Sequence, residues 1–190
     1  MAGGFRPFQD FSGHPYSGKT QTFDVLSSHS TLLAVGDLVA RQSTSNNLTG
    51  RAYVDAGVAG SALTGPIVAI GLSSFQLSDL DQKGLPASTA GQVIVAVGDD
   101  LLMEAEFSNG SIAVTDVGLN FDIVATAATS SGNLVNSNMT VNATGGGTGT
   151  AQVRLMALPV DLFTGAVDLG AGITGIFRIV ESTEYGATGS

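Results

Sequence analysis

The sequence predicts an all-β protein, a single β-sandwich or β-barrel domain of jelly-roll-like or β-tulip-like architecture. Short apolar or alternating runs, turn signals between them and the lack of a sustained helical period all favour this class. A chain of 190 residues buries roughly 70% of its unfolded surface, so it needs no disulfide or metal to fold. We expect the β-domain over residues 25–185 and a flexible tail over residues 186–190.

The densest strand signal lies in residues 91–118, GQVIVAVGDDLLMEAEFSNGSIAVTDVG. The run Val93–Val97 is continuously apolar, which is typical of a strand buried on both faces. In residues 101–107, hydrophobic residues at the odd positions alternate with Glu104 and Glu106. A pleated strand there should bury the hydrophobic residues and expose the two glutamates.

Turn signals separate these strands. Gly98–Asp100 predicts a turn that can close a hairpin, and Asn109-Gly110 predicts a hairpin leading into a third strand. Residues 127–138 are expected to form a loop. The other clear strand patterns are Val35–Ala40, Gly65–Gly71, Phe121–Thr126, Met139–Thr144, Ala151–Ala157 and Gly175–Glu181.

The composition narrows the classes of function. Seven basic and 16 acidic residues give a net charge of −9, which argues against nucleic acid as a partner. Only 12% of residues are charged, as in proteins that share much of their surface with other subunits, although a low-charge monomeric β-protein has a similar composition. Cysteine is absent, which excludes disulfides and thiolate chemistry. No apolar run predicts a secretory signal or membrane span, so we expect no membrane partner.

Residues 1–24 predict an extended N-terminal arm. They show no convincing period, yet they are rich in aromatic residues, in which a solvated tail would be poor. These aromatics either dock on a partner or fold back onto the core of the chain, and both interpretations stay open. The candidate residues for contact with a partner or another subunit are Phe5, Arg6, Phe8, Phe11 and Tyr16.

Within the arm, Gly13–Thr20 (GHPYSGKT) matches the phosphate-loop pattern G-x-x-x-x-G-K-[ST]. Such a loop binds nucleotide when it follows a buried strand and opens a helix. Polar residues interrupt the preceding segment, and no alternation of strands and helices follows. The match therefore leaves a P-loop nucleotide-binding enzyme only as the lowest alternative.

No other motif predicts catalysis. His14 and His29 lack a third histidine or a cysteine that would complete a zinc site. Glu104 and Glu106 could form a glycosidase pair, but a chain without Trp and with 3 Tyr favours a solvated acidic strand face. Asp79–Gly84 resembles a calcium loop that lacks the bidentate Glu. We expect a non-enzymatic protein with no catalytic residue, cofactor or metal.

The order of strand and turn patterns resembles that of a family of small structural proteins from tailed bacteriophages, the capsid cement or decoration proteins. The resemblance covers Val35 to Glu181, and the sequence departs from the family at Val97-Gly98 and in Gly145–Gly149. The matching elements are Gly36–Val39, Gly65–Val68, Leu85–Ser88 leading into Val93–Ala96, the Asp99-Asp100 turn, Met103–Phe107, Val114–Val124, Ser130–Gly132 and Val153–Leu155.

The resemblance implies a virion protein, made in the host cytoplasm, that binds the exterior of an icosahedral capsid and cements neighbouring capsomers. Its expected partners are the major capsid protein and itself, as a homo-oligomer in which a trimer is slightly favoured over a dimer. The alternative is a phage tail or head-fibre component with a role in assembly or glycan binding.

Overall fold

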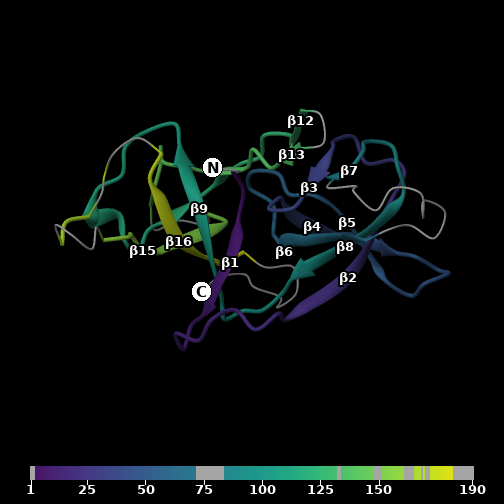
Figure 1. Ribbon diagram of the computed structural model, residues 1–190, viewed down its shortest axis with the longest axis horizontal. Coiled ribbons are helices and arrows are strands. Elements are labelled where there is room, and N and C mark those ends of the chain that lie inside the picture. The colour runs from purple at the N-terminus through teal and green to yellow at the C-terminus, as the bar shows by residue number, and fades with distance from the viewer. Residues whose placement is uncertain are drawn as a thin grey trace.

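The computed structural model describes residues 3–71, 84–131, 134–147, 151–160, 165–167, 169 and 172–181. Apart from the 3-10 helix η1 (Val114–Asp116), its regular elements are strands, which confirms the predicted all-β class. The strands form a closed barrel and a larger open sheet, side by side along the long axis of the molecule (Figure 1). Buried hydrophobic residues gather in two clusters, one inside the barrel and one under the sheet.

The barrel closes in the order β2 (Thr20–Val25), β5 (Ala52–Ala56), β4 (Leu38–Ser45), β6 (Gly65–Gly71) and β8 (Gly91–Ala96). Val93 and Val95 of β8 point into it and are fully buried, whereas Ile94 between them is only half-buried. The prediction that this run is buried on both faces is therefore wrong, because a barrel strand has one inward face. A short pair, β3 (Leu33–Ala34) and β7 (Gly84–Leu85), completes this half.

The open sheet has β9 (Leu101–Ser108) as its longest strand. A separate hairpin of β12 (Thr129–Ser131) and β13 (Leu134–Asn136) stands where a loop was expected. The order of the sheet is β10 (Asn120–Phe121), β15 (Val153–Ala157), β16 (Thr174–Ile179), β9, β14 (Thr140–Asn142) and β11 (Ile123–Val124), with β1 (Arg6–Asp10) also paired to β9.

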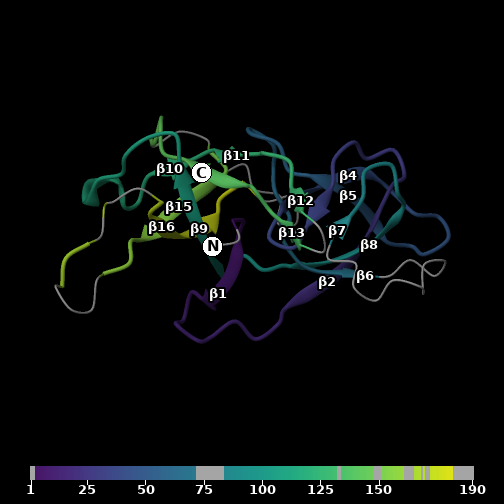
Figure 2. The same cartoon turned by 45° about the horizontal axis from the view of Figure 1, so that its top comes forward.

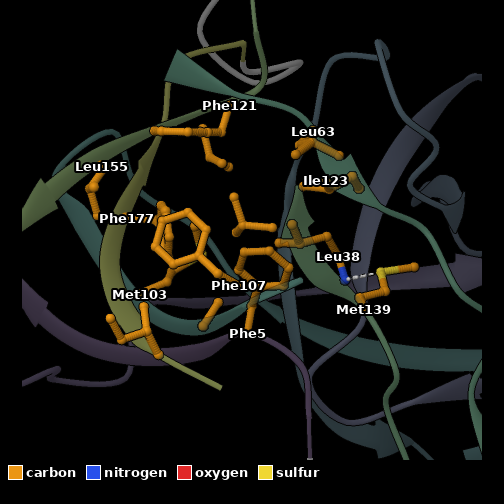
Figure 3. Packing of buried hydrophobic residues seen from close by; sticks show 14 of the residues in the cluster. Phe5, Leu38, Leu63, Met103, Phe107, Phe121, Ile123, Met139, Leu155 and Phe177 are labelled. Atoms are coloured by element: carbon orange, nitrogen blue, oxygen red, sulfur yellow. Dashed lines mark hydrogen bonds between the residues drawn. The ribbon is translucent and has the colours of Figure 1, made fainter. Parts of the chain in front are cut away.

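The predicted alternation along β9 is confirmed from Met103 to Phe107, whereas Leu102 before it is buried as well. Its odd-numbered residues from 101 to 107 are at most 7% exposed and belong to the core cluster under the sheet. In that cluster the Phe107 ring meets the rings of Phe121 and Phe177 edge to face, at centroid distances of 5.5 and 5.0 Å (Figure 3). Glu104 and Glu106 lie on the other face but are only half exposed, because β1 and β16 flank the strand.

Gly98–Asp100 carries the chain from the barrel into the open sheet. β8 pairs with β2 and β6, β9 pairs with β1, β16 and β14, and no ladder joins β8 to β9 within the described residues. The expected hairpin at this turn is therefore wrong. The third strand expected after Asn109-Gly110 is also absent from the described chain, because residues 111–113 leave the sheet and η1 follows.

Residues 6–10 and 20–25 form strands of the two sheets, which corrects the prediction of an extended arm over residues 1–24. β1 pairs along β9, β2 pairs along β8, and Phe5 is fully buried. A register shift between Pro7 and Gln9 breaks the alternation of β1, which explains why no period was visible in the sequence. The expected boundary after residue 24 falls inside β2, and the expected tail over residues 186–190 lies outside the described residues.

A buried carboxylate ties the N-terminal segment and the barrel to the region that precedes β14. Asp37, 1% exposed, accepts hydrogen bonds from Ser137 Oγ at 2.5 Å and from the backbone amide of Ala34 at 2.7 Å. Next to it, the Phe5 amide donates to the Gly36 carbonyl at 2.8 Å. Burial raises the pKa of Asp37 to about 6, against the opposite effect of the two hydrogen bonds.

Candidate interaction surface

The predicted contact residues separate into a buried and an exposed group. Phe5 belongs to the core under the sheet, and Tyr16 is half-buried against that core. Arg6, Phe8 and Phe11 stay at the surface, with the two phenylalanine side chains 45% and 54% exposed. These three residues are therefore the ones that a partner could reach.

Two arginines project from one face of the open sheet, and one of them contacts Phe11. Arg6 lies opposite Glu104 and donates to its Oε2 from Nη2 at 2.9 Å. Arg178 of β16 lies opposite Leu102, which shares the parity of Glu104, so both arginines are on the outer face. The Arg178 guanidinium stands 5.5 Å from the centroid of the Phe11 ring, in cation–π geometry.

Arg154 of β15 extends this set. It pairs across the strands with Arg178 and donates from Nε to Asn120 Oδ1 at 2.8 Å. Three of the seven basic residues of an acidic chain thus share one sheet face. We call the set Arg6, Phe8, Phe11, Arg154 and Arg178 the Arg–Phe surface.

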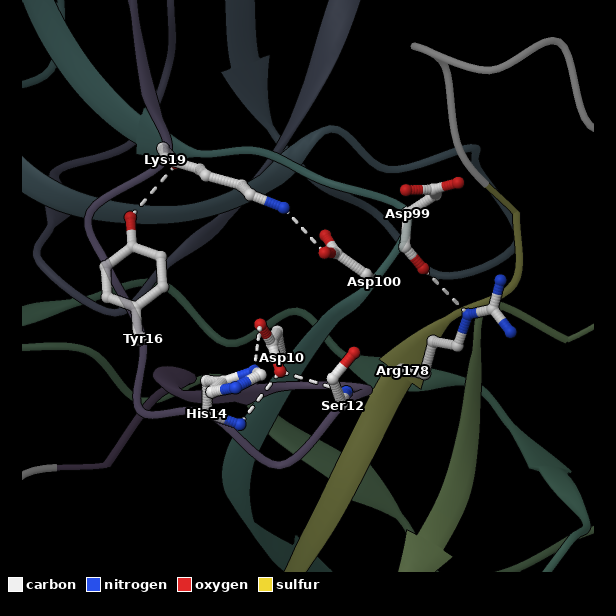
Figure 4. A network of polar contacts seen from close by, with 8 residues as sticks. All are labelled: Asp10, Ser12, His14, Tyr16, Lys19, Asp99, Asp100 and Arg178. Atoms are coloured by element: carbon white, nitrogen blue, oxygen red, sulfur yellow. Dashed lines mark hydrogen bonds and ion pairs between the residues drawn. The ribbon is translucent and has the colours of Figure 1, made fainter.

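The turn that carries Phe11 is held in place by the Asp10 carboxylate. Asp10 Oδ1 accepts hydrogen bonds from the backbone amides of Ser12 and His14, both at 2.9 Å (Figure 4). The Tyr16 amide donates to the Phe8 carbonyl at 3.2 Å, and this bond closes the turn. Phe11 is therefore presented on an ordered turn, which lowers the entropy lost when a partner covers it.

A second set of contacts joins this loop to the turn between β8 and β9. Lys19 Nζ forms an ion pair with Asp100 Oδ2 at 2.6 Å, and Arg178 Nε donates to the Asp99 carbonyl at 3.0 Å (Figure 4). The hydrogen bond from Lys19 lowers the pKa of Asp100 and raises that of Lys19. The segment Gly13–Thr20, which matches the phosphate-loop pattern, therefore forms a structural contact with the Gly98–Asp100 turn.

The structure around Gly13–Thr20 is not that of a phosphate-binding loop. The segment runs into strand β2, so no helix N-terminus points amides at a phosphate. Lys19 is engaged with Asp100, and β8 runs antiparallel to β2, whereas nucleotide-binding sheets of this type are parallel.

Magnesium-ATP and magnesium-GTP are therefore expected to leave the melting temperature of the protein unchanged. Differential scanning fluorimetry of the wild type, Lys19→Ala and Asp100→Asn checks this, because the two variants break the same ion pair from opposite sides. A shift of several degrees in the wild type and in Asp100→Asn, lost in Lys19→Ala, would show that Lys19 binds nucleotide.

The histidine and acidic residues considered as metal ligands do not come together in the described part of the chain. Among the described residues, no three His, Cys, Asp or Glu side chains lie close enough to hold a metal ion. His14 contacts Asp10, whereas His29 is buried beside the Leu26 carbonyl. The segment 79–83 of the calcium-like motif lies outside the described residues.

The chain was compared with protein-family models, with curated proteins and with solved structures, and none of the three comparisons finds a match. No helix within the described ranges has the length and hydrophobicity that a membrane span requires.

Arg154 and Arg178 were not predicted as parts of the surface. Each alternates with buried neighbours along its strand, so each was predictable as an outward residue. It was not predictable that they share a sheet face with Arg6. That arrangement depends on the pairing of β15 with β16, of β16 with β9 and of β9 with β1.

Proposed function

We propose that this protein is a structural virion protein that binds the exterior of an icosahedral bacteriophage capsid and cements neighbouring capsomers. The observation that carries the proposal is the Arg–Phe surface of the open sheet, since arginine and aromatic residues are enriched where proteins bind each other. The resemblance of the strand order from Val35 to Glu181 to capsid cement proteins points to the kind of partner.

Cementing depends on several weak contacts made at once. A homo-oligomer presents the same surface several times, so each contact after the first forms at high effective concentration. Symmetry lets every subunit present the same residues to the repeating lattice of the capsid. No single contact has to be strong, and the shell as a whole resists expansion.

Substituting Phe8 and Phe11 together by serine is expected to weaken capsid binding by at least about tenfold, because anchor residues of this type dominate interface energies. Both side chains are substantially exposed, so the fold should be retained. Cosedimentation with phage heads that lack the protein measures the binding. Deletion of residues 1–24 is unsuitable, because it removes Phe5, β1 and most of β2.

Val58→Ser is the matched control, because Val58 is 56% exposed and lies outside the Arg–Phe surface. It should decorate heads like the wild type. Full decoration by the double variant, or an equal loss in the Val58 variant, would contradict the assignment of this surface. Failure of the wild type to bind heads would contradict the proposed function itself.

A further inference from the structure

The tip of the β4–β5 hairpin presents a leucine to solvent. The Leu48 side chain is 96% exposed, the highest value of any large hydrophobic residue in the described chain. The loop around it is closed by backbone hydrogen bonds of 2.8 Å from Asn46 to Arg51 and from Gly50 to Asn46. The Leu48 amide donates to Asn46 Oδ1 at 2.9 Å. The leucine therefore stands on an ordered loop.

A buried carboxylate anchors this loop to the barrel. Asp24 of β2 is 3% exposed, and its Oδ2 accepts hydrogen bonds from Asn46 Nδ2 at 2.8 Å and from Thr49 Oγ1. Arg51 Nη1 stands 3.9 Å from Asp24 Oδ1. The loop thus holds Leu48 in a fixed place, which makes an exposed leucine an effective docking group.

The opposite end of the molecule has an open pocket lined in part by hydrophobic side chains. Its volume is about 230 Å³, and its walls include Phe107, Ile112, Leu169 and Ile173. At roughly 30 Å³ for each water molecule of the liquid, the pocket has room for several waters or for one branched aliphatic side chain. Burial of a leucine side chain there would be favourable by the hydrophobic effect.

The leucine and the pocket cannot meet within one molecule. The β4–β5 hairpin tip (blue) lies at one end of the long axis, and the segment with η1 (teal) lies at the other, in both views (Figures 1 and 2). Only another copy can bring the two together. Two copies can form an antiparallel dimer in which this contact occurs twice. Alternatively, several copies can form a closed ring with one such contact per subunit.

Charge on the two ends is complementary. Residues 41–51 include Arg41 and Arg51 and no acidic residue. Residues 107–112, which supply part of the pocket wall, carry no charge and are flanked in the chain by Glu106 and Asp116. Glu106 borders the pocket at Gly172, and Asp116 lies in η1 close to Ile112 in the chain. The hairpin thus carries two basic residues, one of them 3.9 Å from the Asp24 carboxylate, and the pocket has an acidic residue at its edge.

We propose that this protein self-associates by inserting Leu48 of one copy into the pocket around Ile112 of the next, with the arginines of the hairpin toward the acidic residue at the pocket edge. The partner is a second copy of this chain. The contact uses neither the Arg–Phe surface nor a capsid, but it rests on the proposed function in one respect, because it would form the homo-oligomer on which cementing depends.

Two variants separate the halves of the contact. Leu48→Asp removes the leucine and keeps the pocket, whereas Ser111→Trp fills the pocket and keeps the leucine; both positions are exposed, so both proteins should fold. Light scattering after size exclusion is expected to give an oligomer for the wild type and a monomer for each variant. A 1:1 mixture of the variants should form dimers, because the Ser111→Trp variant still supplies Leu48 and the Leu48→Asp variant still supplies the open pocket.

Leu134→Asp, at another exposed leucine, is the control and should keep the mass of the wild type. A wild type that stays monomeric up to roughly 100 µM, or variants that keep the oligomer, would overturn the proposal. A monomeric variant that still binds phage heads would show that capsid binding does not require this contact, so failure of self-association and failure of capsid binding are distinguishable.

Because the chain contains no cysteine, introduced cysteines allow a second test by disulfide cross-linking of the full-length protein. The double variant Leu48→Cys, Ser111→Cys is expected to form disulfide-linked multimers under mild oxidation. Mixed single variants should give only dimers, in excess of the dimers that each single variant forms alone. Equal cross-linking in all samples would refute insertion of the hairpin into the pocket.

Discussion

Phe5→Ala is expected to lower the free energy of unfolding by about 3–5 kcal/mol, the usual cost of emptying a buried phenylalanine site. The Phe5 side chain is fully buried, in the same cluster as Met103, Phe107 and Phe177 (Figure 3). It also directly precedes β1, so its loss should loosen the pairing of that strand with β9. Urea unfolding followed by circular dichroism measures the change.

Phe8→Ala provides the comparison, since Phe8 is only three residues away and is 45% exposed. It should cost less than about 1 kcal/mol, as surface substitutions generally do. If both variants had the same free energy of unfolding as the wild type, the N-terminal segment would be a detachable arm and not part of the core. The pair therefore tests whether residues 5–10 belong to the core.

Asp37→Asn is expected to stabilise the protein above pH 7 and to remove part of its pH dependence. The pKa of Asp37 is raised from 3.8 to about 6 by burial, so the folded state keeps a proton that the unfolded state releases between these values. The contribution of Asp37 to the free energy of unfolding is therefore greatest below about pH 4 and decreases as the pH rises to about 6. The shift corresponds to about 3 kcal/mol.

The amide should keep the local hydrogen bonds, because it can accept from the Ala34 amide and donate to Ser137 Oγ. Unfolding free energies at pH 4 and pH 8 are compared for wild type, Asp37→Asn and the exposed control Asp99→Asn, which removes the same charge. The control should follow the wild type. A wild type and an Asp37 variant with parallel pH profiles would show that the carboxyl group is not desolvated.

The alternation along β9 illustrates what a local pattern can predict. Hydrophobic residues at positions 101, 103, 105 and 107 set which face is buried, whatever strands lie on either side. The half-exposure of Glu104 could not be predicted in the same way. It depends on β1, which arrives from nearly a hundred residues earlier and places Arg6 beside the glutamate.

The candidate surface was predictable only in part. Arg6, Phe8 and Phe11 were identified from an aromatic segment without a period, whereas Phe5 and Tyr16 from the same segment pack inward. Whether an aromatic residue is an anchor or a core residue depends on what covers it. That information lies in the ladder between β1 and β9 and not in the composition of the segment.

The sequence alone determined the all-β class, the inward face of β9 and the acidic turn at Gly98–Asp100, because side-chain period and turn chemistry are local properties. Only the tertiary structure decided that this turn joins two sheets and that the N-terminal segment contributes a strand to each. The physical reason is that a period of two specifies which side chains are buried but leaves the hydrogen-bonding partner of each strand edge open.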